Sequence, residues 1–313
     1  MRVLFWGTPE FAAPAFRALV GEGHDVVAVV TQPDRPRARS GRNRSQADPS
    51  PVKVAAAEEG IPVLQPHRPR GADFVAALRA FAPDVSVVVA YGHILPRDVI
   101  DLPRLGTLNI HGSLLPLYRG AAPIQAAIRD GRADTGVTIM RMVPALDAGP
   151  VILAERTDIL PDETAGELQL RLAELGAEAI VEALALIELG GARETPQDDA
   201  AATHAPKLTR EGARVDWTAP ASVVERAVRA YDPKPGAWTM LGDVEVRLFG
   251  ARRLTGLGGT PGTVLRIDDD GMSVACGEDA VRIAEVHPAS RKRQPASEWA
   301  RGRGIAAGDV FTG

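Results

Sequence analysis

Three polar side chains in the sequence are of the types that acyl transfer to an amine requires. Asn109 and His111 lie two residues apart in a run with strand character, so both side chains point to the same face. Asp147 follows later, in a Leu-Asp-Ala-Gly turn. A carboxamide and an imidazole can donate hydrogen bonds to a developing oxyanion, and a carboxylate can orient the imidazole or move the proton of the amine. Such chemistry needs no covalent enzyme intermediate.

Other kinds of chemistry have less support in the sequence. The first predicted strand-to-helix turn, Gly7-Thr8-Pro9, lacks the Gly-x-Gly-x-x-Gly fingerprint of dinucleotide-binding proteins, so a nicotinamide enzyme is not indicated. We find no convincing Ser-His-Asp order, and no second His or Cys at metal-ligand spacing near His111, so we expect no metal. The Asn-His-Asp triple could also be structural, and these residues alone leave that interpretation open.

The elements that must position these residues alternate between short β-branched runs and helical patterns. This alternation predicts a doubly wound, mostly parallel, Rossmann-like α/β sheet, in which ligands bind beyond the C-terminal ends of the strands. Residues 163–188 form the longest helical pattern. The strand-like runs are residues 3–5, 26–30, 63–64, 85–90 and 108–110.

The pattern changes in the last third of the chain. We predict a first domain over residues 1–190, a linker without periodicity over 191–206, and a smaller domain over 207–313. In the smaller domain, four strand-length runs separated by glycine- and aspartate-containing turns predict a β-barrel, OB-like in type. We expect its core to contain Trp217, Trp238, Trp299 and Cys276.

The composition is that of an ordinary globular protein. Of 313 residues, 45% are hydrophobic and 24% are charged, which excludes a disordered or fibrous chain. Cys276 is the single cysteine and cannot form an intramolecular disulfide, which favours a reducing compartment. No apolar run approaches the ~20 residues that span a membrane, and the N-terminus reads directly into a strand. We therefore expect a cytoplasmic protein, and a monomer.

A basic segment interrupts an otherwise acidic first half. The chain has 36 Lys and Arg against 40 Asp and Glu, a net charge of −4. Such a segment is commonly a solvated loop, but its arginines could also bind a phosphate backbone. The same two interpretations apply to a short run in the smaller domain, Arg291, Lys292 and Arg293. The positive charges of the basic segment are Arg35, Arg37, Arg39, Arg42, Arg44 and Lys53.

Longer stretches of the chain resemble the methionyl-tRNA formyltransferases, within the folate-dependent formyltransferases. The resemblance covers essentially the whole chain. In the first domain it is carried by NIHGSLLPLYRGAAPIQA at 109–126, TGVTIM at 135–140, LDAG at 146–149, VTQPDRP at 30–36, PSPVK at 49–53 and AYG at 90–92. In the smaller domain it is carried by RAYDPKPG at 229–236 and PGT at 261–263.

The resemblance implies a formyltransferase-type first domain and a tRNA-binding β-barrel. It implies transfer of a formyl group from 10-formyltetrahydrofolate to the α-amino group of methionyl initiator tRNA, for translation initiation. The amine would attack the formyl carbon directly, Asn109 and His111 would stabilise the oxyanion that forms, and Asp147 would orient His111 and handle the proton. The pKa of a free α-amino group is about 7.7–8.0, so the neutral nucleophile is accessible without a metal.

The resemblance also assigns the binding residues. The folate would bind Tyr91, Gly92, Ser113, Leu114, Leu115 and Pro116. Given this resemblance, the charge of the basic segment favours contact of Arg35, Arg37, Arg39, Arg42 and Arg44 with the acceptor arm of the tRNA. The β-barrel would add backbone contacts, for which Arg291, Lys292 and Arg293 are the candidates, with a surface turn as the alternative.

Two other functions stay open at this point. Transfer to a sugar-nucleotide amine or a purine precursor would use the same donor, but a small acceptor requires neither the barrel nor the basic segment. A tRNA-binding protein without catalysis would gain nothing from Asn109, His111 and Asp147.

Overall fold

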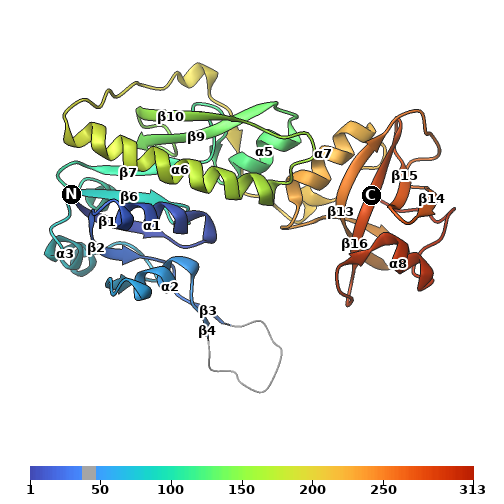
Figure 1. Cartoon of the computed structure of the whole chain (residues 1–313), viewed down its shortest axis with the longest axis horizontal. Coiled ribbons are helices and arrows are strands. Elements are labelled where there is room, and N and C mark those ends of the chain that lie inside the picture. Colours follow the sequence, from blue (N-terminus) through green and yellow to red (C-terminus); the bar gives the residue numbers. More distant parts are fainter. Residues whose placement is uncertain (37–46) are drawn as a thin grey trace. The chain divides into compact units, whose positions relative to one another are not determined.

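The computed structural model describes residues 1–36 and 47–313, which form two compact units. The first unit is built on a seven-stranded sheet (Figure 1). The central strands pair in parallel and β7 pairs antiparallel with β9, which confirms the predicted mostly parallel sheet. Strand β10 was not predicted from the sequence. In spatial order the strands are β10 (Val151–Asp158), β9 (Asp134–Arg141), β7 (Thr107–His111), β6 (Val85–Val89), β1 (Arg2–Gly7), β2 (Asp25–Val30) and β5 (Val63–Leu64).

Helices cover both faces of this sheet. Trp6 of β1 lies in a buried cluster with residues of α3 and α4, whereas Phe5 points the other way and packs edge-on against Phe16 of α1, with ring centroids 5.5 Å apart. The alternation of side chains along β1 thus decides which helix covers which face. The helices are α1 (Ala13–Gly21), α2 (Pro51–Glu58), α3 (Ala72–Ala80), α4 (Arg97–Ile100) and α6 (Ala165–Glu188), the last close to its predicted range.

Helix α6 packs closely against β7. Gly176 of α6 faces Ile110, and a Cβ atom on this glycine would lie 2.8 Å from Cγ2 of Ile110. The helix can approach the strand here because position 176 has no side chain. Ile110 lies between Asn109 and His111 in the strand, so these two residues point to the face opposite α6.

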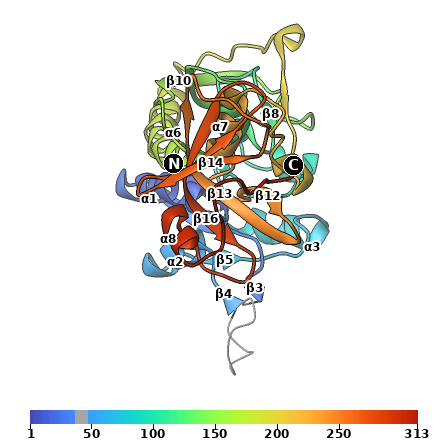
Figure 2. The same ribbon diagram turned by 90° about the vertical axis from the view of Figure 1, so that its right-hand side faces the viewer.

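The second unit is built on a six-stranded antiparallel sheet (Figure 2). Four of its strands fall on the runs predicted from the sequence, and β12 and β17 are additional. In spatial order they are β12 (Ala237–Leu241), β13 (Val244–Leu254), β16 (Ala280–Pro288), β15 (Gly271–Ala275) and β14 (Val264–Asp268), with β17 (Gln294–Pro295) also paired to β16. The helices of this unit are α5 (Pro123–Arg129), α7 (Ala221–Tyr231) and α8 (Ala296–Arg301).

The C-terminal residues connect the two edge strands of this sheet. Met240 of β12 and Thr312 exchange two backbone hydrogen bonds, of 3.1 and 2.9 Å. Thr263, directly before β14, forms a bridge with Val310. Both edges are therefore paired, as in the β-barrel that we predicted. As expected, the buried core includes Trp217, Trp238, Trp299 and Cys276.

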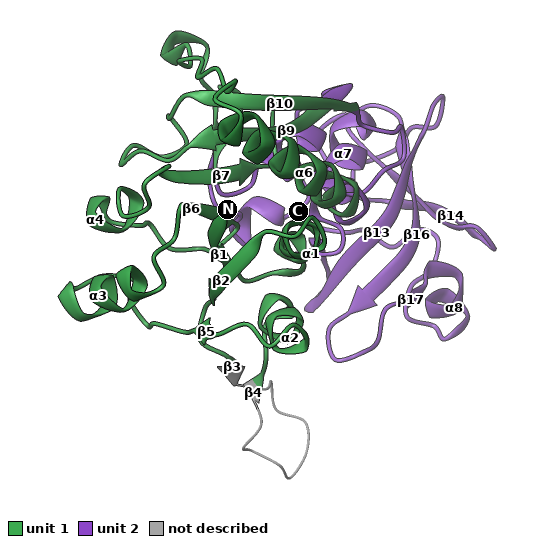
Figure 3. Cartoon of the chain, turned by 60° about the vertical axis from the view of Figure 1, so that its left-hand side comes forward, with its two compact units in different colours: residues 1–120, 135–157, 169–204 green, residues 121–134, 158–168, 205–313 purple. Residues whose placement is uncertain are grey.

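Each of the two compact units is made of several separate stretches of the chain. The second unit comprises residues 121–134, 158–168 and 205–313, so it takes two segments from the predicted first domain (Figure 3). The predicted linker belongs to the first unit up to residue 204 and contains a short 3-10 turn at Asp199–Ala201. In the described part of the chain, no helix combines the length and the apolar character needed to cross a membrane.

Candidate active site

The carboxyl end of β7 carries the first two predicted catalytic residues. Asn109 is in register with Val88 of the parallel neighbour β6, and His111 is in register with Thr138 of the antiparallel neighbour β9. The predicted common face is therefore held by strand pairing on both sides. Asn109 is half-buried, and no described residue forms a hydrogen bond with its carboxamide. The side chain keeps its N–H groups for a ligand.

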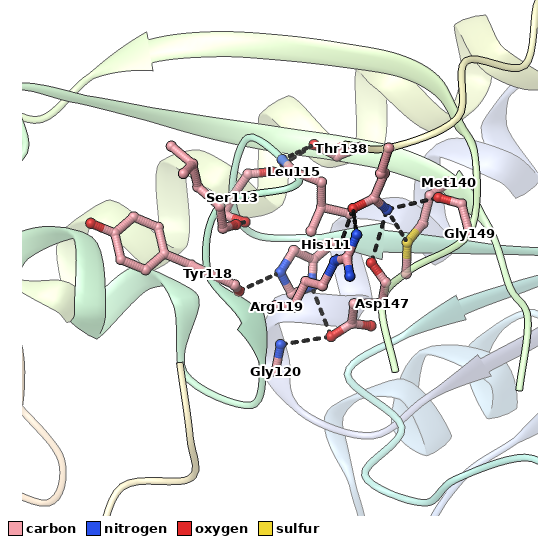
Figure 4. Close-up of polar contacts among 12 residues, drawn as sticks. His111, Ser113, Leu115, Tyr118, Arg119, Gly120, Thr138, Met140, Asp147 and Gly149 are labelled. Atoms are coloured by element: carbon pink, nitrogen blue, oxygen red, sulfur yellow. Dashed lines mark hydrogen bonds and ion pairs between the residues drawn. The ribbon is translucent and has the colours of Figure 1, made fainter. Parts of the chain in front are cut away.

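His111 and Asp147 come together from distant parts of the chain. Nδ1 of His111 lies 3.7 Å from Oδ2 of Asp147 (Figure 4). The same carboxylate oxygen accepts a hydrogen bond of 2.8 Å from the backbone N–H of Gly120. His111 is only 5% exposed, and its Nε2 lies 2.9 Å from the carbonyl oxygen of Tyr118. No group of three or more His, Cys, Asp and Glu side chains in the described ranges is placed to hold a metal ion.

The surroundings of His111 determine where its ring can gain a proton. A carbonyl oxygen 2.9 Å from Nε2 requires a proton on that nitrogen, so in the neutral ring Nδ1 is the acceptor. Burial lowers the pKa of His111, while the Asp147 carboxylate and the hydrogen bond to Tyr118 raise it. The ring is therefore a base at Nδ1, beside a carboxylate that stabilises the imidazolium once it forms.

The residues after His111 form a loop tied to β9. Oγ of Ser113 donates a hydrogen bond of 2.6 Å to the carbonyl of Leu117. Oγ1 of Thr138 donates to the carbonyl of Ser113 (2.7 Å) and accepts from the backbone N–H of Leu115 (3.1 Å). The Ser113 hydroxyl, which we predicted to bind folate, thus serves the loop itself. The loop is fixed in position by these contacts.

The other predicted folate residues lie in different environments. Leu114, Leu115 and Pro116 are half-buried, so part of each side chain is open to a ligand. Tyr91 is 2% exposed, its ring packs edge-on against Trp6, and burial raises its pKa to about 12. Its side chain therefore belongs to the core. At Tyr91 and the exposed Gly92, the main chain is the part that a ligand could contact.

The predicted tRNA-binding residues fall into two groups. Arg37, Arg39, Arg42 and Arg44 lie outside the described residues, and of Arg35 the structure describes the backbone, in the short strand β3 (Arg35–Pro36). Arg291 and Lys292 are exposed in the turn between β16 and β17.

Arg293 differs from its two neighbours because it has partners within its own unit. Its Nη1 lies 3.3 Å from Oδ1 of Asp232 and its Nη2 lies 2.5 Å from Oε2 of Glu285. The guanidinium also lies 4.0 Å from the centroid of the Phe249 ring. These contacts give Arg293 a structural role in the second unit. Its guanidinium therefore has fewer N–H groups available for a phosphate than it would without these partners.

Two residues that were not singled out from the sequence support the site. Buried Arg119 donates to Oε1 of Gln197 through Nε and Nη2, at 3.0 and 2.8 Å, and to Oδ1 of Asp199 at 2.7 Å. Nε2 of Gln197 donates to the carbonyl oxygens of Asp147 and Gly149, at 2.9 and 2.7 Å. Arg119 lies within the family-like stretch 109–126. The sequence around Gln197 is aperiodic and gave no signal.

Known proteins resemble this chain in sequence and in domain content. The model of the formyl transferase family matches residues 1–184, and that of the formyl transferase C-terminal domain matches residues 207–304. The methionyl-tRNA formyltransferase of Aromatoleum aromaticum is 48% identical over 99% of this chain and 97% of its own length. This chain belongs to the methionyl-tRNA formyltransferase family. The resemblance noted in the sequence is thereby confirmed.

Solved structures share the fold. HypX from Aquifex aeolicus in complex with tetrahydrofolic acid matches 95% of this chain and 46% of its own, with a TM-score of 0.65 and 24% identity. The methionyl-tRNA formyltransferase from Clostridium thermocellum matches 82% of this chain and 95% of its own, with a TM-score of 0.59 and 13% identity. At such identities the likeness concerns the fold, which agrees with the predicted fold class.

Proposed function

We propose that this chain transfers the formyl group of 10-formyltetrahydrofolate to the α-amino group of methionine on initiator tRNA, in the cytoplasm, for translation initiation. Family membership supports the reaction. The observation that carries the catalytic assignment is the contact of buried His111 with half-buried Asp147, with 3.7 Å between Nδ1 and Oδ2; His111 lies on the strand face that also bears Asn109. These side chains supply a proton acceptor and a hydrogen-bond donor for a carbonyl.

The reaction joins the methionine nitrogen to the formyl carbon and breaks the bond between that carbon and N10 of the folate. The neutral amine attacks, and the carbonyl oxygen becomes an oxyanion to which Asn109 donates. The amine proton passes to Nδ1 of His111, because Nε2 is already protonated and bonded to Tyr118. Asp147 stabilises the imidazolium. The Nδ1 proton can then assist the oxyanion and finally protonate the departing folate nitrogen.

The proposed substrate contacts follow the surroundings of each residue. The folate would contact Leu114, Leu115 and Pro116, which follow β7, and the main chain at Tyr91 and Gly92, which follow its parallel neighbour β6. The domain assignment of 1–190 to catalysis and 207–313 to tRNA binding remains part of this proposal.

For tRNA binding, the proposal rests on charge. The arginines between Arg35 and Arg44 would contact the acceptor arm, and the exposed Arg291 and Lys292 would add backbone contacts. Neutralising Arg42 and Arg44 should raise KM for tRNA and reduce the salt dependence of binding, because fewer counterions are released. The dependence of the binding constant on salt is measured by titrating tRNA at several ionic strengths. An unchanged dependence would indicate that this segment is a solvated loop without contact to the tRNA.

One assay tests the proposed reaction directly. The purified chain is offered 10-formyltetrahydrofolate with methionine-charged initiator tRNA, methionine-charged elongator tRNA and a sugar-nucleotide amine in parallel. We expect formylation of the initiator tRNA far above the other two acceptors. Preferred formylation of the sugar nucleotide, or tRNA binding without formylation, would replace the proposal by one of the two alternatives.

A further inference from the structure

One side chain of the predicted linker differs from its neighbours. Across residues 193–200 every side chain is exposed except that of Gln197, which is half-buried. Its Nε2 donates to the carbonyl oxygens of Asp147 and Gly149, and its Oε1 accepts twice from Arg119. Figure 4 shows Arg119, Asp147 and Gly149 around this contact. Gln197 thus binds its segment to the turn at residues 147–149, which carries Asp147 and is called the catalytic turn below.

The partners of Gln197 permit one orientation of its amide. Arg119 can only donate hydrogen bonds and the two carbonyl oxygens can only accept them, so Oε1 faces the guanidinium and the NH₂ group faces the turn. Arg119 is itself 7% exposed and bound to Asp199, with 2.7 Å between Nη2 and Oδ1. Gln197 is therefore held from one side while it holds the turn on the other.

The main chain around Asp147 depends on this contact. Within the described residues, no backbone N–H donates to the carbonyl oxygen of Asp147 or of Gly149. Asp147 also has a φ of +50°, in the left-handed region that side chains other than glycine seldom adopt. Such a conformation persists when surrounding contacts enforce it. Gln197 supplies two of those contacts.

We propose that Gln197 is a positioning residue for formyl transfer, which fixes the main chain of Asp147 and thereby sets the carboxylate at Nδ1 of His111. The inference rests on the proposed function, in which His111 and Asp147 handle the proton. Misplacement of a catalytic group by about 1 Å can lower a rate by about a hundredfold. A hydrogen bond to the main chain of a catalytic residue is therefore a direct way to control the rate.

Two substitutions separate the contacts of Gln197. Gln197→Ala removes all of them, whereas Gln197→Glu keeps the shape and the contact to Arg119 but turns an oxygen toward the two carbonyl oxygens. Both variants should lower kcat about 10- to 100-fold, because both release the turn. KM for 10-formyltetrahydrofolate should change far less than kcat, since the half-buried residues 114–116 are untouched.

Glu194→Gln is the matched control. Glu194 lies in the same segment, is exposed, and pairs with Arg141 on β9, with 2.6 Å between Oε1 and Nε. This substitution loosens the segment without touching the catalytic turn. It should leave kcat within about twofold of the wild type, because exposed ion pairs contribute little. An equal loss of kcat in Glu194→Gln and the Gln197 variants would overturn the proposal.

A second measurement does not require activity. NMR titration of the His111 ring should give a lower pKa in Gln197→Ala than in the wild type, whereas Gln197→Glu adds a negative charge near the ring and is therefore judged by kcat alone. In Gln197→Ala the Asp147 carboxylate, which raises this pKa, is displaced, while burial and the Tyr118 carbonyl stay in place. Either an unchanged His111 pKa in Gln197→Ala or an unchanged kcat in the variants overturns the proposal. If the wild type transfers no formyl group, the proposed function fails and the titration still decides the role of Gln197.

Discussion

Asn109 and His111 lie on one strand face but have different environments. Asn109 is half-buried and its carboxamide has no partner among the described residues, which suits a donor that waits for a carbonyl oxygen. His111 is buried and its Nε2 is bonded to Tyr118, which restricts its proton exchange to Nδ1. Depth of burial therefore distinguishes the donor to the oxyanion, Asn109, from the proton acceptor, His111, two residues apart on one strand face.

At the scale of single residues, Asn109→Ala should lower the rate of formyl transfer by about 10²-fold or more, the effect of losing one oxyanion donor. The half-buried carboxamide has no described internal partner, so the fold should persist. Single-turnover kinetics measures the rate, and circular dichroism verifies folding. A folded variant with wild-type turnover would remove Asn109 from the mechanism.

His111 should also make stability depend on pH. Burial lowers its pKa below the ordinary value of 6.5, so the unfolded chain binds more protons than the folded chain in the interval below 6.5. The contribution of His111 to the free energy of unfolding should therefore be greatest above pH 6.5. It should fall as the pH drops from 6.5 toward the lowered pKa of the folded state.

Chemical denaturation at several pH values checks this dependence. His24 has a pKa shifted in the same direction, so each histidine must be replaced separately. His111→Gln should flatten the slope of stability against pH more than His24→Gln, since His111 is the more deeply buried. Identical slopes in wild type and His111→Gln would contradict the expectation.

At the scale of elements, helix α6 supports the catalytic strand through Gly176. Alanine normally stabilises a helix by about 1 kcal/mol relative to glycine, but here its Cβ would lie 2.8 Å from Cγ2 of Ile110. Gly176→Ala should instead lower stability by about 1–3 kcal/mol, the usual cost of overpacking, and displace the strand that bears Asn109 and His111. Both Tm and kcat should fall.

Gly21→Ala in α1 is the control for this substitution. Nothing lies within 4 Å of the Cβ that it would add, so it should be neutral or slightly stabilising. Thermal unfolding and formyl-transfer kinetics on the two variants decide between the outcomes. A Gly176→Ala variant that is as stable and as active as Gly21→Ala would show that β7 tolerates the extra methyl group.

At the scale of the whole molecule, the second unit incorporates segments from the part of the chain that carries the catalytic residues. Arg229 of α7 donates to the carbonyl of Glu163 at 2.9 Å and forms an ion pair with Glu225. The backbone N–H of Gly166 donates to the carbonyl of Asp232 at 3.0 Å. The RAYDPKPG stretch thus binds residues 158–168 within this unit.

Gly166 provides a test of that packing. A Cβ at this position would lie 2.6 Å from Cδ of Pro233, and a proline ring cannot rotate away. Gly166→Ala should therefore lower Tm through a loss of about 1–3 kcal/mol. Gly258→Ala, with nothing within 4 Å, is the control and should leave Tm unchanged. Equal Tm values would show that the segment can shift without cost.

The sequence by itself determined the order and type of most elements, because hydrophobic periodicity and turn residues are local properties. The strand that carries Asn109 and His111, the helix over 163–188 and the four runs of the second unit were predicted in this way. Strands β10, β12 and β17 were missed. The triple Asn109, His111 and Asp147 was selected by residue type and by resemblance, which are also readable along the chain.

The tertiary structure decided everything that depends on contacts between distant residues. It brought Asp147 to 3.7 Å from His111 and placed Tyr91 in the core. It also gave the Ser113 hydroxyl a hydrogen-bond partner within its own loop, the carbonyl of Leu117. It also brought Gln197, from a segment without periodicity, into contact with the carbonyl oxygens of Asp147 and Gly149. Hydrogen bonds of this kind join residues far apart in the sequence, and no local pattern records them, because their geometry exists only once the strands have paired and the turns have closed.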